Sequence, residues 1–107
     1  MKLSITDKLQ SGKPVLEIYG KEFEIDNRKD TVLTYAEQNF KSMKTGEVME
    51  ETIRHFAGEN ALKEIRNMKE LSFRDYEKIA SAIMSLAMEI PFEEAEARFQ
   101  KSAGNQN

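Results

Sequence analysis

The chain has 107 residues, of which 39% are hydrophobic and 33% charged, and its formal net charge is −3. This length supports one hydrophobic core, and the apolar fraction is too high for a disordered chain. The negative charge argues against a partner held mainly through phosphate contacts, so nucleic acid is not an expected partner. Cysteine is absent, which excludes a disulfide framework and thiolate metal ligands and favours the reducing cytoplasm. No segment is apolar enough for a signal peptide or a membrane span, so we expect no membrane association.

Residues 15–25 carry the clearest strand pattern in the chain. Leu16 and Ile18 alternate with charged or polar residues on the first half, and Phe23 and Ile25 do so on the second half. Such alternation around a glycine predicts a β-hairpin. With a two-residue type II′ turn that has the glycine first, Ile18 would face Phe23 and Leu16 would face Ile25.

The hairpin needs further cover on one face and solvent on the other. The predicted register sets Glu17 opposite Glu24, a like-charge pair that is tolerable only in water. A lone hairpin is marginally stable, so a helix or a third strand must pack against it. Leu3 and Ile5 alternate with polar residues and are the candidates for such a third strand.

From about residue 28 the apolar residues recur at the three- and four-residue intervals of amphipathic helices. The pattern predicts four to five short helices. The first runs from about 28 and ends at Thr45-Gly46, the second covers 48–56 and is closed by Gly58, and the third covers 60–68. A capping box at 72–75 opens a central helix, and a last helix follows Pro91. The expected fold class is therefore α+β, mainly α, with an N-terminal β-hairpin followed by a helical bundle. We expect a single domain over 1–101 and a frayed tail over 102–107.

Catalytic, cofactor and metal sites are not predicted. His55 is the only histidine, and no serine lies in a nucleophile-elbow context. Glu51, His55 and Glu59 are spaced at i, i+4 and i+8 and could line up on an unbroken helix, but Gly58 should break that helix. The five glycines are isolated, so no phosphate-binding loop or dinucleotide motif can be assembled.

Two binding surfaces can be considered. A helix-turn-helix could place Arg74 and Lys78 in a DNA groove, but basic and acidic residues are interleaved there, as on a salt-bridged exposed face. The methionines are numerous, and Met84 and Met88 could contribute to an adaptable binding surface, although core filling is the commoner use of this side chain. A binding or assembly protein remains as the expectation.

Four segments carry a resemblance to a known family: the predicted hairpin over 15–25, the run Gly58-Glu-Asn-Ala-Leu-Lys-Glu-Ile65, the run Leu71-Ser-Phe-Arg-Asp-Tyr-Glu-Lys-Ile79 and the ending Pro91-Phe-Glu-Glu-Ala-Glu-Ala-Arg-Phe99. In the order of its elements and in apolar spacing, the chain resembles the tail assembly chaperones of long-tailed bacteriophages and prophages. These segments cover most of the chain.

The resemblance implies a non-enzymatic protein of the host cytoplasm. It implies that the chain binds the long coiled-coil tape measure protein, keeps it soluble and assists tail tube subunits to assemble around it. A homo-oligomer is compatible with this role. The protein-binding residues expected are Met84, Met88, Phe92 and Phe99, with burial of Phe99 in its own domain as the favoured alternative to a partner contact. A small helical regulator, either a DNA-binding repressor or an antitoxin-like protein, is the alternative function.

Overall fold

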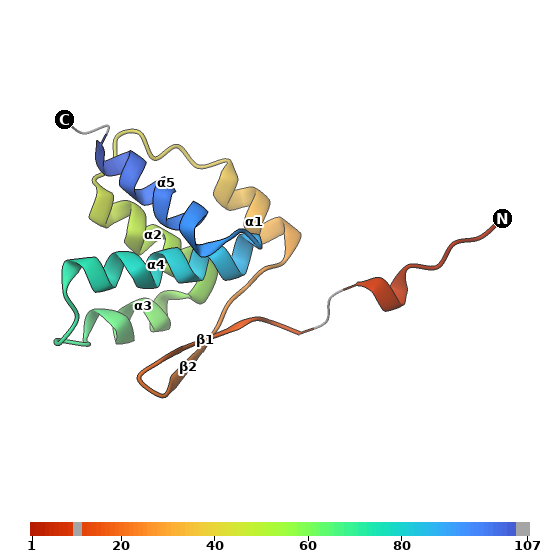
Figure 1. Cartoon of the computed structure of the whole chain (residues 1–107), viewed down its shortest axis with the longest axis horizontal. Helices are drawn as coiled ribbons and strands as arrows, with labels where there is room; N and C mark the ends of the chain where they lie inside the picture. The colour runs from red at the N-terminus through yellow and green to blue at the C-terminus, as the bar shows by residue number, and fades with distance from the viewer. Residues whose placement is uncertain (10–11, 105–107) are drawn as a thin grey trace.

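The computed structural model describes residues 1–9 and 12–104, and of residues 101–104 the backbone only. Figure 1 shows a two-stranded hairpin beside a bundle of helices. The elements are β1 (Val15–Ile18), β2 (Lys21–Glu24), α1 (Lys29–Ala36), α2 (Thr45–Ala57), α3 (Glu59–Arg66), α4 (Phe73–Met88) and α5 (Phe92–Gly104). The expected fold class, α+β and mainly α, is confirmed. Helix α5 continues past Lys101 to Gly104, whereas residues 105–107 of the predicted frayed tail lie outside the described residues.

Helix α4 lies at the centre of the bundle. It packs against α2 and α5, and α2 packs in turn against α3. Its capping box forms as predicted, because the Asp75 N–H donates to Ser72 Oγ at 3.0 Å and the Ser72 N–H donates to Asp75 Oδ2 at 3.1 Å. The largest fully buried side chains are Phe56, Phe99, Ile25, Met49, Ile53, Leu62, Ile65 and Ile83. Every helix contributes to the core, and the contribution of α1 is Tyr35 at its last turn.

The hairpin forms, but its predicted register is wrong. The turn residues are Tyr19 and Gly20, with φ of 52° and 83°, which is the type I′ geometry rather than type II′. Leu16 therefore pairs with Phe23 and Glu17 with Glu22. Moving the turn by one residue shifts every pairing by two positions, so each side chain keeps its predicted face. The alternation of apolar and polar residues specified the two faces of the hairpin, whereas the type I′ turn set which residues pair across it.

The predicted third strand is also wrong. Within residues 1–9 and 12–104 the sheet has two strands, and the only regular element before it is the 3₁₀ turn Thr6–Lys8. Leu3 and Ile5 are 81% and 50% exposed. Figure 1 shows their segment extending away from the body of the domain. Alternating residues define the faces of a strand but not whether a pairing edge lies within its reach.

The first helix is shorter than predicted. It ends at Ala36, and Thr45 and Gly46 begin α2 instead of ending α1. In the loop between them, the Lys41 N–H donates to the Asn39 side chain at 3.0 Å, a local turn that competes with helix. Three predicted boundaries are confirmed: Gly58, with φ of 98°, separates α2 from α3, Ser72 caps α4, and the chain leaves α4 just before Pro91.

Candidate functional site: an apolar hollow

A hollow of about 360 Å³ opens between α1, α4 and α5. We call it the apolar hollow. Its lining comes from three helices, from Val48 on α2 and from the loop after α1, and comprises Tyr35, Ala36, Gln38, Phe40, Val48, Met84, Met88, Arg98 and Phe99. Residues separated by more than sixty positions in the chain therefore share one surface.

The floor of the apolar hollow includes three of the four predicted protein-binding residues. Met84 and Phe99 are 3% and 1% exposed, so they belong to the hydrophobic core as well as to the lining of the hollow. Met88 is half-buried. Phe92 is half-buried as well but lies outside the lining. Burial of Phe99 in its own domain, the alternative favoured from the sequence, is confirmed.

The wall beside α1 is held by a buried hydrogen-bond chain. Thr52 Oγ1 donates to the carbonyl oxygen of Val48 at 2.8 Å, and it therefore accepts the Tyr35 hydroxyl proton at 2.7 Å. Burial raises the pKa of Tyr35 above its usual value, which keeps the phenol protonated as this donor. The Tyr35 ring also packs against Phe40 and Phe56, with ring centroids 5.2 and 4.7 Å apart.

His55 ties the same wall to α2. Its Nε2 lies 2.7 Å from the carbonyl oxygen of Thr31, so Nε2–H is the donor. Nδ1 then accepts from the Gln38 side-chain amide at 3.3 Å. Both ring nitrogens are therefore occupied by structural hydrogen bonds. His55 therefore ties α1 and the loop after it to α2.

The acidic neighbours of His55 do not form a metal site. Glu51 and Glu59 both bind Arg54, at 2.8 and 2.7 Å. In the described part of the chain, no group of three or more histidine, cysteine, aspartate or glutamate side chains is arranged to hold a metal ion. The i, i+4, i+8 spacing is interrupted at Gly58, as the sequence predicted.

One cation lies at the rim of the apolar hollow. Arg98 Nη1 is 3.8 Å from the Met88 sulfur. Among the residues for which side chains are described, Arg98 makes no ion pair. The hollow thus combines a polarizable apolar floor with one guanidinium available for a carboxylate. Tyr35, Phe40 and Arg98 were not expected at a common site, because no local pattern brings residues of the first and last helices to one surface.

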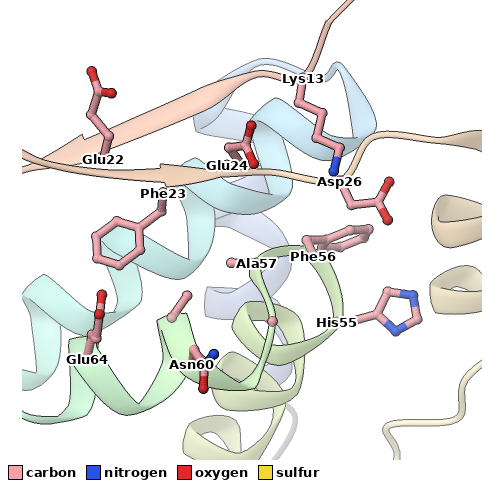
Figure 2. A pocket seen from close by; sticks show the side chains of 12 residues that line it. Lys13, Glu22, Phe23, Glu24, Asp26, His55, Phe56, Ala57, Asn60 and Glu64 are labelled. Atoms are coloured by element: carbon pink, nitrogen blue, oxygen red, sulfur yellow. The ribbon is translucent and has the colours of Figure 1, made fainter.

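A second, more polar hollow of about 500 Å³ lies under the hairpin (Figure 2). Phe23 points from β2 toward α3, whereas Glu22 projects from the opposite face of the strand. The Asp26 carboxylate is occupied by Arg28, at 2.8 and 2.9 Å, and by the Thr31 hydroxyl at 2.9 Å. Hydrogen bonding to Arg28 holds the pKa of Asp26 well below its usual range. Glu64, which also lines this hollow, pairs with Lys21 at 3.2 Å.

Ion pairs cross the face that a helix-turn-helix would present to DNA. Lys78 pairs with Glu96 at 3.3 Å, and Arg66 makes two 2.7 Å hydrogen bonds to Glu50. Arg74 is exposed. Pairing with carboxylates reduces the positive field that a phosphate backbone would require.

Comparison with known proteins gives no match: no family model, curated protein or solved structure is similar to this chain. Over residues 1–9 and 12–104, no helix is both long and apolar enough to cross a membrane.

Proposed function

We propose that the chain is a non-catalytic binding protein whose apolar hollow receives side chains from one face of a partner helix. In the role that the resemblance implies, it is a phage tail assembly chaperone of the host cytoplasm that binds the tape measure protein and assists tail tube assembly. The observation that carries the proposal is the hollow itself, with its methionine and phenylalanine floor and the guanidinium of Arg98 at the rim.

The size and lining of the hollow favour a few apolar side chains over a complete ligand. Its volume of about 360 Å³ lies near the lower end of the range for ligand pockets. An amphipathic helix laid across the opening would insert residues at i, i+3 or i+4 and i+7. Methionine is flexible and polarizable, so Met88 can adapt to different apolar side chains along a long partner.

Arg98 gives the partner a charge preference. An acidic residue beside the inserted apolar side chains could pair with the guanidinium at the rim. Coiled-coil helices carry such charged residues next to their apolar seam. A tape measure segment with glutamate beside its leucine seam is therefore the class of partner we propose.

The alternative, a small helical regulator that binds DNA, has less support. Lys78 and Arg66 are engaged by Glu96 and Glu50, and the chain carries a formal charge of −3. The two functions differ in salt dependence, because DNA binding weakens steeply with salt whereas apolar insertion does not.

The test is a titration of a fluorescent coiled-coil peptide, with leucine along its seam and glutamate beside it, into the wild-type protein and three variants. Met88→Glu should weaken binding about tenfold or more, since it places a charge in the hollow. Arg98→Glu should shift the preference to a peptide in which lysine replaces glutamate. Leu33→Glu is the matched control, because Leu33 is 58% exposed on α1 and lies outside the lining; it should bind as the wild type does.

A wild-type protein without affinity for the peptide would contradict the proposal, as would a Met88→Glu variant that binds unchanged. The same variants can be co-expressed with the tape measure protein. We expect the wild type and Leu33→Glu to keep that protein in the soluble fraction, and Met88→Glu to lose this effect.

A further inference from the structure

The segment before the hairpin exposes apolar side chains that nothing in its own domain covers. We call residues 1–9 the leading arm. Its four large apolar residues are exposed by 50% or more: Met1, Leu3, Ile5 and Leu9. In Figure 1 the leading arm runs away from the helical bundle. Single exposed apolar residues are normal on protein surfaces, but four of them within nine positions form a concentrated apolar surface.

On the side of β1, the hairpin has an unpaired edge and an incompletely buried inner face. β1 pairs with β2 only, so its other edge presents unpaired backbone N–H and C=O groups within the described chain. On the inner face, Phe23 of β2 is 5% exposed, and Ile25 just after it is 0% exposed. Leu16 and Ile18 of β1 share that face but are only half-buried. The cover over the inner face is therefore incomplete at the edge strand.

The leading arm complements this edge in both pattern and charge. In an extended conformation Leu3 and Ile5 would share one face, and Lys2 and Ser4 would share the other. A strand added with its apolar side inward would set Leu3 and Ile5 beside the half-buried residues of β1. Its outer side would bring Lys2 to the outer face of the hairpin, which carries the exposed carboxylates of Glu17, Glu22 and Glu24.

We propose that the leading arm of a second copy of this chain adds to the free edge of β1 as a third strand. The occupant is a second copy because the arm is directed away from its own hairpin and carries the side chains that the edge lacks. Residues 1–5 span about 16 Å when extended, which matches the four residues of β1. Exchange of both arms gives a two-fold dimer in which each copy donates one strand and accepts one.

The first test measures the oligomeric state by sedimentation velocity across a range of concentrations. The wild type should show a concentration-dependent dimer. Ile5→Asp should weaken the dimer about tenfold or more, because it puts a carboxylate on the buried side of the added strand. Leu33→Asp is the matched control, since it changes an equally exposed leucine on α1 and should leave the dimer intact. A wild-type protein that remains monomeric at every concentration would overturn the proposal.

The second test locates the contact by cysteine cross-linking, which is site-specific because the natural chain has no cysteine. A Ser4→Cys protein is mixed with a Glu17→Cys protein and treated with a short bismaleimide. Arm exchange predicts a cross-linked heterodimer. If the Ser4→Cys, Glu17→Cys double variant instead cross-links only within one chain, the arm folds onto its own hairpin and the proposal is wrong.

The dimer and the partner-binding hollow are separable. Met88→Glu should leave dimerisation unchanged, because Met88 lies in the apolar hollow and not on the hairpin. If Met88→Glu abolishes the dimer, the arm occupies the hollow and not the edge of β1, and this inference fails. Loss of peptide binding with an intact dimer would leave the strand exchange standing.

Discussion

Replacement of Phe99 by alanine measures how strongly α5 is held to the bundle. Phe99 is 1% exposed, and with Ala95 it forms the buried face of a helix that packs mainly against α4. Phenylalanine-to-alanine changes in a packed core cost about 3 to 5 kcal/mol. A domain of this length has a total unfolding free energy of about 5 to 15 kcal/mol. We therefore expect Phe99→Ala to remove a large part of the stability.

The assay is urea unfolding followed by far-ultraviolet circular dichroism, with the free energy of unfolding obtained by linear extrapolation. A loss of about 3 kcal/mol corresponds to a fall in melting temperature of roughly 12 °C or more for a domain of about 100 residues. Phe92→Ala is the matched control on the same helix, because Phe92 is only half-buried; it should cost clearly less. If Phe99→Ala melts like the wild type and loses only partner binding, the reasoning from burial is refuted.

Four further predictions concern stability and its dependence on pH. Thr45→Val should leave the unfolding free energy unchanged or raise it by up to about 1 kcal/mol, because the buried Thr45 hydroxyl has no hydrogen-bond partner among the residues that the structure describes. Thr52→Val should lower it by about 1 to 3 kcal/mol in the same urea titration, since the buried Tyr35 hydroxyl loses its acceptor. Gly58→Ala should cost about 1 kcal/mol or more from backbone strain alone, because φ is +98° and the added Cβ meets no atom within 4 Å; an unchanged melting temperature would contradict this. The pKa of Asp26 is depressed from 3.8, so its stabilising contribution is present above about pH 4 and is lost as the pH falls further; Asp26→Asn should flatten this acid-dependent decline in melting temperature.

The elements that were predicted correctly are those determined by neighbouring residues. Ser72 and Asp75 form their capping box within one turn, and Gly58 adopts a positive φ that few other residues tolerate. The inward face of the hairpin followed from the alternation of apolar residues, because side-chain direction depends only on the backbone period. The predicted end of α1 was too late, because helical apolar spacing continues past Ala36 into the loop. In that loop the Asn39 side chain accepts a hydrogen bond from the Lys41 N–H, which favours a turn over a helix.

Four features follow from the amino-acid sequence alone: the mainly helical class, the order of the elements, the two faces of the hairpin and the burial of Phe99 in a core. Three others are set by the fold: the turn that the hairpin uses, the position of Leu3 and Ile5 outside its sheet, and the hollow around which Met88, Arg98 and Tyr35 meet. The two sets differ in the range of the interactions along the chain. Caps, turns and periodicity act within a few residues, whereas a hollow depends on the packing of helices that are distant in the chain, and no local pattern specifies which of their side chains will share a surface.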